Sequence, residues 1–143
     1  MVRLLDLHDL RAPLQLRVEE GMPVWGTCAG MILMAKSLAE DRPEPLSLMD
    51  IKVTRNAYGR QLESFETNLD VPALGKAQLN AIFIRAPGIV EIGTGVEVLA
   101  RLPNGTPVAV REGSKVATAF HPELTNDFRF HEYFIGIIYE VVA

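Results

Sequence analysis

The chain has 143 residues, 48% of them hydrophobic, and fourteen basic against eighteen acidic residues give a formal net charge of −4. This length and apolar content suit one globular domain over residues 1–143, with a buried core. The sequence contains no cluster of lysines and arginines that could bind along a phosphate backbone, so we expect no nucleic-acid partner. The single cysteine excludes an internal disulfide and any multi-thiolate metal site.

Neither terminal segment has the pattern of a targeting or membrane sequence. Residues 1–11 place two aspartates among leucines and lack an uninterrupted apolar stretch. Residues 134–143 are interrupted by Glu140 and fall far short of the ~20 apolar residues that a membrane span needs. We therefore expect a cytoplasmic protein that does not contact a membrane.

The first part of the chain predicts a helix, a short strand and a second helix. Leucines recur at helical spacing over residues 3–20, which predicts an amphipathic helix that is broken or bent near Pro13 and closed by Gly21. Residues 23–25 form a short apolar segment that leads into Gly26. Residues 29–38 follow with good helix formers and no proline. Residues 23–38 are therefore predicted to form a strand, a tight turn and a helix, in that order.

The second part is rich in predicted strands. Proline and acidic residues at 40–47 indicate a surface loop. Asn104-Gly105 predicts a hairpin turn, and aromatic and apolar residues at helical spacing predict a terminal helix over residues 127–142. Alternating or continuous apolar segments predict strands over 50–55, 63–71, 79–85, 96–102, 107–112 and 115–120. Together these elements indicate an α/β domain.

The cysteine lies in the stretch Gly26-Thr27-Cys28-Ala29-Gly30, between a strand and a helix. This order fits a nucleophile elbow, in which both glycines relieve crowding at a sharp turn. The helix N-terminus would favour the thiolate of Cys28, and the backbone N–H of Ala29 would face an oxyanion. The alternative is a small buried cysteine with glycines that serve only helix–strand packing.

A thiolate nucleophile needs a base, and the chain has three histidines. His8 lies among charged residues and is expected on the surface, whereas His131 falls in the terminal helix, where a packing role is expected. His121 follows an apolar strand and opens His121-Pro122-Glu123. Residues two apart at a strand end project to the same side, so Glu123 can orient the imidazole.

These residues would form a triad in the order cysteine, histidine, glutamate. A different interpretation of His121-Pro122-Glu123 is a strand-to-helix turn in which the carboxylate only favours the helix start. The two interpretations stay open at this level.

Four blocks of sequence carry a resemblance to a known family. The chain resembles the glutaminase subunit of pyridoxal 5'-phosphate synthase, a class I, triad-type glutamine amidotransferase, over almost its whole length. The blocks are Gly26-Thr27-Cys28-Ala29-Gly30-Met31-Ile32, residues 53–66 (VTRNAYGRQLESFE), residues 82–87 (IFIRAP) and residues 117–125 (ATAFHPELT).

The resemblance implies that Cys28 attacks the side-chain amide of L-glutamine, that His121 relays the proton and that Glu123 holds His121. It implies that Arg55 and the Ile84-Arg85 pair contact the substrate. It further implies ammonia transfer to a synthase (lyase) subunit in a hetero-oligomer, and no cofactor or metal in the glutaminase itself.

The same resemblance implies a flavodoxin-like, three-layer α/β/α fold. In the family a β-α-β portion and a Pro-Gly-Gly-Glu-Ser loop precede the region that this sequence matches, so we expect a domain truncated at its N-terminus. Because that loop supplies an oxyanion donor, one alternative is a non-catalytic homologue that only binds the synthase subunit. A separate alternative is another class I amidotransferase, which differs in its acceptor subunit.

Overall fold

The computed structural model describes residues 1–58 and 64–142. Part of the resemblance block at 53–66, including Arg60, lies outside the described residues, as does Glu63, the first residue of a predicted strand. The helices are α1 (Val2–Leu7), α2 (Arg11–Glu19), α3 (Ala29–Met34) and α4 (Arg129–Val142), with 3₁₀ turns η1 (Pro72–Leu74) and η2 (Pro122–Leu124). The strands are β1 (Val24–Thr27), β2 (Ala35–Leu38), β3 (Met49–Thr54), β4 (Ser64–Leu69), β5 (Leu79–Ile84), β6 (Gly88–Ile92), β7 (Glu97–Arg101), β8 (Pro107–Glu112) and β9 (Lys115–Thr118).

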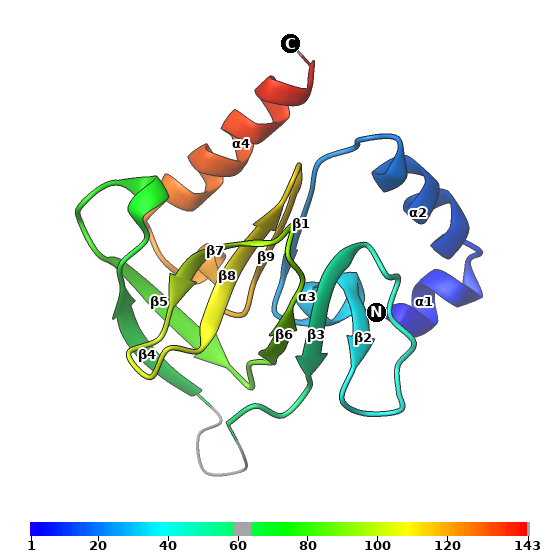
Figure 1. Cartoon of the computed structure of the whole chain (residues 1–143), viewed down its shortest axis with the longest axis horizontal. Coiled ribbons are helices and arrows are strands. Elements are labelled where there is room, and N and C mark those ends of the chain that lie inside the picture. Colours follow the sequence, from blue (N-terminus) through cyan, green and yellow to red (C-terminus); the bar gives the residue numbers. More distant parts are fainter. Residues whose placement is uncertain (59–63, 143) are drawn as a thin grey trace.

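The described strands form three sheets, in the orders β1-β9-β8-β7, β2-β3-β6 and β4-β5. The pairs β1–β9 and β2–β3 are parallel, and the other pairs are antiparallel. Figure 1 shows the sheets in the middle of the molecule, with α1 and α2 at one side and α4 at another. The α/β class predicted from the sequence is confirmed.

The parallel pair β1–β9 fixes the geometry on which the site depends. Val24 pairs with Lys115 and Thr27 pairs with Thr118, so both strands end at the same edge of the sheet. Cys28 follows the last paired residue of β1, and His121 comes three residues after the last paired residue of β9. Two motifs far apart in the sequence therefore start from one edge.

The core is built from strands that are buried on both faces. Val108, Ala109 and Val110 of β8 are fully buried, as are Val116 and Ala117 of β9. Continuous apolar runs of this kind are typical of central strands. A row of aromatic side chains connects α4 with β5 and β4, with ring centroids 4.5–5.9 Å apart: Trp25, Phe130, Phe120, Phe83 and Phe65.

The predicted helix over 3–20 is two helices, and its break is not where the sequence predicted it. The chain turns at residues 8–10, where Asp9 adopts a φ of 54°. Pro13 lies in the first turn of α2, where its missing N–H costs nothing because first-turn N–H groups have no intrahelical acceptor. Gly21 has a φ of 103° after α2, as expected of a residue that ends a helix.

The predicted helix over 29–38 ends at Met34. Ala35 has φ −58° and ψ 149°, and the chain passes without a loop into β2, which pairs in parallel with β3. The hydrogen bonds that β3 offers outweigh the helix propensity of these residues. Strand β6 was also absent from the prediction, and it pairs antiparallel with β3.

The remaining predicted elements are confirmed within one or two residues among those described. Gly105, in the predicted hairpin between β7 and β8, has a φ of 89°, and Asn104 Oδ1 accepts a hydrogen bond from the N–H of Thr106. The terminal helix α4 begins at Arg129 and buries Phe130 and Ile137.

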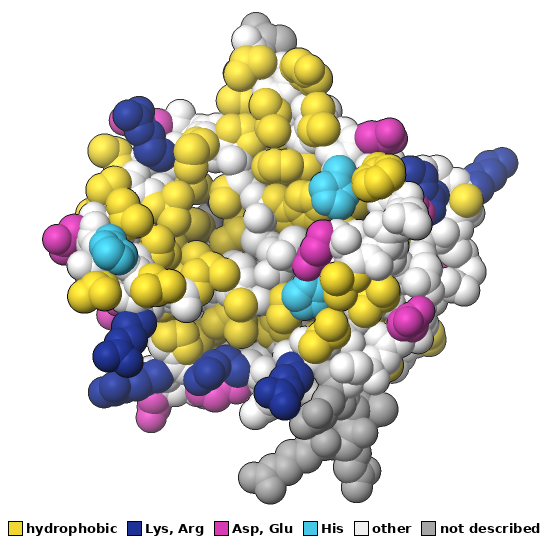
Figure 2. Space-filling model, turned by 180° about the vertical axis from the view of Figure 1, so that it is seen from behind, with side chains coloured by type: hydrophobic (Ala, Val, Ile, Leu, Met, Phe, Trp, Pro, Cys, Tyr) yellow, Lys and Arg dark blue, Asp and Glu magenta, His cyan; other side chains and the backbone are white. Residues whose placement is uncertain are grey.

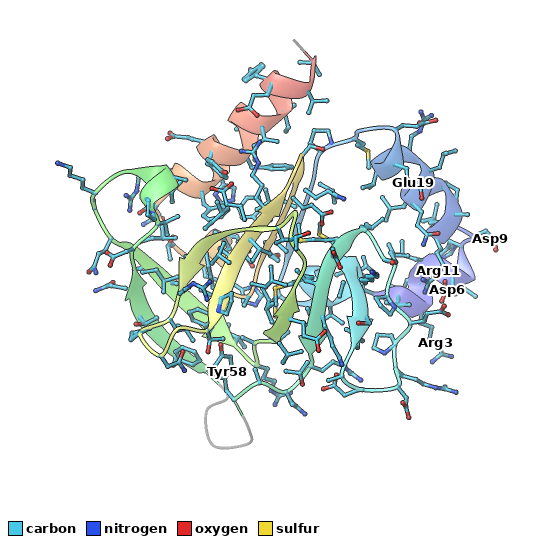
Figure 3. The ribbon with its side chains drawn as sticks, in the orientation of Figure 1. Arg3, Asp6, Asp9, Arg11, Glu19 and Tyr58 are labelled. Atoms are coloured by element: carbon cyan, nitrogen blue, oxygen red, sulfur yellow. The ribbon has the colours of Figure 1, made fainter. Side chains whose placement is uncertain are left out.

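Helices α1 and α2 are tied to the loop that follows β2. Arg11 donates to Asp6 at 2.7 Å and to the carbonyl oxygens of Glu44 and Pro45 at 2.9 and 3.0 Å. Figure 3 labels Asp6 and Arg11, which form this ion pair, at this side of the molecule. Polar contacts of one arginine thus join both helices to the body.

Candidate active site

Cys28 stands at the turn between β1 and α3 in a conformation that ordinary residues avoid. Its φ is 51° and its ψ is −105°. The backbone N–H of Cys28 donates to the carbonyl oxygen of Thr118 at 2.8 Å, which extends the β1–β9 ladder to the cysteine. Strained residues of this kind cluster at active sites, where the surrounding structure holds them.

The two glycines that flank Cys28 are not equivalent. A Cβ added to Gly26 would lie 2.5 Å from Sδ of Met34 and 2.6 Å from the backbone of Gly30, so no side chain fits. A Cβ on Gly30 would meet nothing within 4 Å. The expectation that both glycines relieve crowding therefore holds only for Gly26.

His121 and Glu123 are in direct contact. Nδ1 of His121 lies 2.6 Å from Oε1 of Glu123, and the backbone N–H of His121 donates to the carbonyl oxygen of Ile82 at 2.9 Å. The carboxylate therefore fixes one ring nitrogen and leaves Nε2 for other chemistry. The segment is also a strand-to-helix turn, since η2 starts at Pro122.

Strand β5 links the cysteine with the histidine. The thiol of Cys28 donates to the carbonyl oxygen of Ile84, with a sulfur–oxygen distance of 3.7 Å. Ile82, two residues earlier, holds the backbone of His121. Cys28, Ile84 and His121 are thereby gathered at the ends of β1, β5 and β9.

The pKa of the Cys28 thiol is raised above its ordinary value. Burial is the largest cause, because it disfavours the charged thiolate, and the negative charge of Glu123 acts in the same direction. A hydrogen bond from the backbone N–H of Ala29 opposes both. The helix start thus favours the thiolate as expected, but burial outweighs it.

The residues predicted to contact substrate lie in two places. Arg55 lines a hollow of about 390 Å³ together with Ala29 and Ile32, next to the cysteine turn, and Arg3 and Arg42 also line it. Arg85 follows Ile84 at the end of β5 and has a φ of 45°. Ala29 therefore connects the Cys28 turn with the hollow of Arg55, and Ile84 connects that turn with Arg85.

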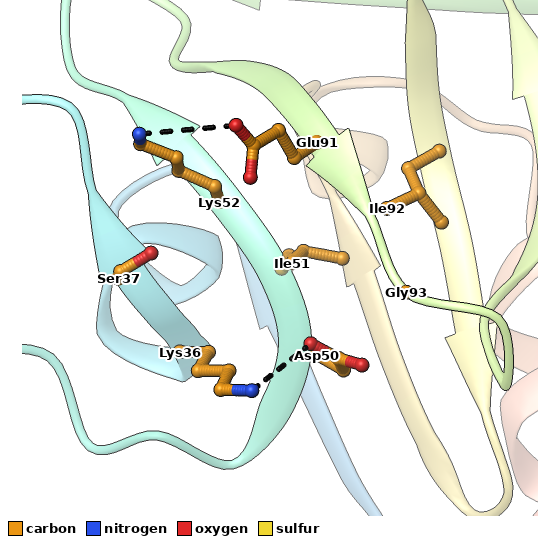
Figure 4. Close-up of a pocket in the computed structure, with 8 residues that line it drawn as sticks. All are labelled: Lys36, Ser37, Asp50, Ile51, Lys52, Glu91, Ile92 and Gly93. Atoms are coloured by element: carbon orange, nitrogen blue, oxygen red, sulfur yellow. Dashed lines mark ion pairs between the residues drawn. The ribbon is translucent and has the colours of Figure 1, made fainter.

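A second hollow, of about 240 Å³, lies on the β2–β3–β6 sheet and holds none of the predicted site residues. Figure 4 shows its two ion pairs, Lys36 with Asp50 at 3.6 Å and Lys52 with Glu91 at 3.9 Å. The four charges cancel within the hollow. It has the character of a solvated sheet face.

Apolar side chains gather around a hollowed region on the face opposite to that of Figure 1 (Figure 2). Helix α1 contributes no buried residue to the core and α2 contributes only Val18. Large hydrophobic side chains of the chain are correspondingly exposed, among them Leu4, Leu7, Leu10, Leu16, Leu124 and Phe128. The amphipathic pattern at the start of the chain therefore faces solvent in large part.

The two remaining histidines behave as the sequence predicts. His8 is exposed. His131 packs edge-on against Trp25, with ring centroids 5.1 Å apart. Sequence reasoning missed the carbonyls of Ile82 and Thr118, and it named Ile84 as a substrate contact without assigning its carbonyl a bond to Cys28. Backbone carbonyls leave no mark on residue type, so no sequence signal could have found them.

Among residues 1–58 and 64–142, no group of three or more His, Cys, Asp or Glu side chains could hold a metal ion. No helix in this part of the chain is long and apolar enough to cross a membrane.

Comparison with known proteins identifies relatives over nearly the whole chain. The "Pyridoxal 5'-phosphate synthase subunit PdxT" of Herpetosiphon aurantiacus is 59% identical over 138 residues, which cover 94% of this chain and 73% of that protein. The protein of the same name from Dehalococcoides mccartyi is 53% identical over 137 residues, covering 94% of this chain and 70% of that protein.

A solved structure described as a glutamine amidotransferase superposes with a TM-score of 0.87 at 45% identity, covering 94% of this chain and 71% of the other. The fold is therefore the α/β fold of class I glutamine amidotransferases. The model of the SNO glutamine amidotransferase family matches residues 1–140. The chain belongs to the SNO glutamine amidotransferase family.

Proposed function

We propose that this protein hydrolyses L-glutamine to L-glutamate and ammonia, with Cys28 as nucleophile, His121 as proton relay and Glu123 as the group that orients His121. One observation carries the proposal. The strained Cys28 directly follows β1, which pairs with β9, the strand that leads into His121, and His121 is itself bonded to Glu123 at 2.6 Å. A buried packing cysteine needs neither feature.

The proposed chemistry proceeds in two balanced steps. The Cys28 sulfur attacks the side-chain carbonyl carbon of glutamine as His121 takes the thiol proton, and the C–N bond breaks as His121 returns that proton to the leaving ammonia. Water then attacks the γ-glutamyl thioester, with His121 as base, and releases glutamate and the thiol. The negatively charged Glu123 stabilises the imidazolium in both steps.

Substrate binding is assigned to Arg55, Ile84 and Arg85, with Ala29 as backbone donor to the oxyanion. A guanidinium offers paired N–H donors that match a carboxylate, which suits the α-carboxylate of glutamine. The position of Arg55 in a hollow beside Ala29 supports this role. The elbow geometry supports Ala29, because the N–H after a nucleophile faces the reacting carbonyl.

The ammonia is proposed to pass to the synthase subunit of a pyridoxal 5'-phosphate synthase. The relatives at 59% and 53% identity are named as subunits of that enzyme, which supports a hetero-oligomeric partnership. A covered route to the partner would keep ammonia from protonation in water.

The test is a glutaminase assay of the chain in complex with a synthase subunit, with glutamate release as the measurement. We expect turnover that Cys28→Ala abolishes. The matched control is Thr27→Ser, which alters the neighbouring residue and keeps the thiol. Turnover that survives in Cys28→Ala would refute the proposed nucleophile.

A second candidate is a protein that binds the synthase without hydrolysing glutamine. The raised pKa of the Cys28 thiol favours it, because a neutral thiol is a poor nucleophile. Alkylation by a glutamine analogue separates the two candidates. Stoichiometric modification of Cys28 in the complex supports the glutaminase, and an inert thiol supports the binding protein.

A further inference from the structure

Glu40 holds the backbone of Arg55 from an adjacent loop. Glu40 lies just beyond β2, and its Oε1 accepts the backbone N–H of Arg55 at 2.9 Å and the hydroxyl of Thr54 at 2.7 Å. Both donors stand at the end of β3, where the strand gives way to a turn. A carboxylate that accepts two donors makes strong, charge-assisted bonds, so Glu40 fixes the direction in which the chain leaves the strand.

The same loop also holds the side chain of Arg55. Its Nη1 donates to the carbonyl oxygen of Arg42 at 3.2 Å, two residues after Glu40. Arg55 is otherwise exposed and has a long side chain with many rotamers. The backbone and the guanidinium are therefore both held by one short segment, and Arg55 lines the hollow to which Ala29 also contributes.

The second carboxylate oxygen of Glu40 is shielded from solvent. Among the described residues, Oε2 is buried and has no hydrogen-bond partner, whereas Oε1 has two. Burying part of a carboxylate is costly unless its bonds compensate. The hydrogen bonds from Thr54 and Arg55 also hold the pKa of Glu40 below its ordinary value, so the group stays charged at neutral pH.

We infer that Glu40 is a positioning residue for glutamine binding, which acts through Arg55 and touches no substrate itself. The inference rests on the proposed function, because it needs Arg55 to bind the substrate. Preorganising a guanidinium lowers the entropy cost of binding a carboxylate. Glu40 should therefore affect the KM for glutamine and leave kcat nearly unchanged.

The first experiment measures kcat and KM for glutamine in the complex with the synthase subunit. We expect Glu40→Ala to raise KM about tenfold with kcat within about twofold, since a charge-assisted bond is lost. Glu40→Gln keeps an acceptor oxygen and should restore KM to within about threefold of the parent. Glu44→Ala removes an exposed carboxylate from the same loop and should leave both constants unchanged.

A double-mutant cycle distinguishes positioning from a general structural effect. Arg55→Ala should raise KM by itself, and adding Glu40→Ala should then raise it no further, because the group that Glu40 positions is gone. Additive effects of the two substitutions would overturn the inference. An unchanged KM in Glu40→Ala would overturn it as well.

A measurement without turnover separates this inference from the proposed function. The backbone amide of Arg55 should resonate downfield in the parent, because it donates to a carboxylate, and should move upfield in Glu40→Ala but not in Glu44→Ala. A parent without glutaminase activity refutes the proposed function, and the inferred role in glutamine binding falls with it. The amide shift then decides whether Glu40 holds Arg55, and an unmoved amide refutes that contact.

Discussion

The backbone N–H of Cys28 donates to the carbonyl oxygen of Thr118 at 2.8 Å, one residue beyond the last pair of the β1–β9 ladder. The proposed nucleophile is thus held by the strand that leads to its proposed base. Thr118 is fully buried, and its hydroxyl accepts the indole N–H of Trp25 at 3.1 Å and donates to the carbonyl of Phe120. One residue therefore braces the cysteine turn, a core aromatic ring and the approach to His121.

We predict that Thr118→Val lowers the free energy of unfolding by about 1–3 kcal/mol, because the indole N–H of Trp25 loses its acceptor. Chemical denaturation followed by tryptophan fluorescence measures the change. Thr67→Val is the control, since that half-buried position lies in β4 away from the site, and it should change stability by less than about 0.5 kcal/mol. Equal effects of the two substitutions would contradict the prediction.

Gly26→Ala should destabilise the fold by at least about 2 kcal/mol, because the new methyl group meets the backbone of Gly30 and neither can move without disturbing the turn. Gly30→Ala should cause no loss of stability, because its methyl group meets nothing within 4 Å. Thermal denaturation of both variants measures the difference. If Gly26→Ala is as stable as Gly30→Ala, the close contact between Gly26 and the backbone of Gly30 is contradicted.

The reaction of Cys28 with iodoacetamide should rise with pH about a midpoint above that of an unperturbed thiol, because burial raises its pKa. Glu123→Gln removes a negative charge that disfavours the thiolate, so the midpoint should shift to lower pH. The measurement is the alkylation rate as a function of pH. Glu97→Gln, on β7, is the control and should leave the midpoint in place, and a shift to higher pH in Glu123→Gln would reverse the sign of the prediction.

Asp127 contributes pH-dependent stability through Arg129. Hydrogen bonds from Arg129, 2.6 Å away, lower the pKa of Asp127 below its ordinary value of 3.8. The stabilisation is therefore complete above that value and is lost as the pH falls through the lowered pKa. Asp127→Asn should be less stable than the parent at neutral pH, and the difference should vanish in strong acid.

Urea denaturation of the parent and of Asp127→Asn at a series of pH values measures this difference. Asp41→Asn, which removes an exposed carboxylate from the loop after β2, should follow the parent at every pH. A gap between the parent and Asp127→Asn that stays constant into strong acid would show that the lost charge is not the cause.

The sequence predicted those parts of the fold in which local pattern and tertiary packing agree. Strands β8 and β9 each contain a continuous buried apolar segment, residues 108–110 and 116–117, and the turn at Gly105 needs a residue that tolerates positive φ. The helix predicted for residues 35–38 was wrong because helix propensity reflects only the local sequence. These residues form a strand because they pair with β3, which lies further along the chain. The predicted position of the helix break was wrong because proline is the strongest helix-breaking signal in the sequence of this segment. In the structure Pro13 lies in a first helical turn, where proline is tolerated, and the break lies at Asp9.

The sequence predicted which residues form the candidate site, but it did not predict the environment of Cys28. Cys28, His121 and Glu123 were found because a thiol, an imidazole and a carboxylate carry recognisable chemistry. The contact between His121 and Glu123 agrees with the spacing argument. The raised pKa of Cys28 could not be predicted, since burial depends on how β5 and η2 pack around the turn.

The site constrains the number of residues in strand β5. Its carbonyls at Ile82 and Ile84 face the same side because they are two residues apart, and each holds one half of the proposed site. A one-residue insertion between residues 82 and 84 would turn one of these carbonyls to the opposite side and separate the two halves. The loop between β7 and β8 carries no such pairing, so we expect natural variants to differ in length there and to keep the length of β5.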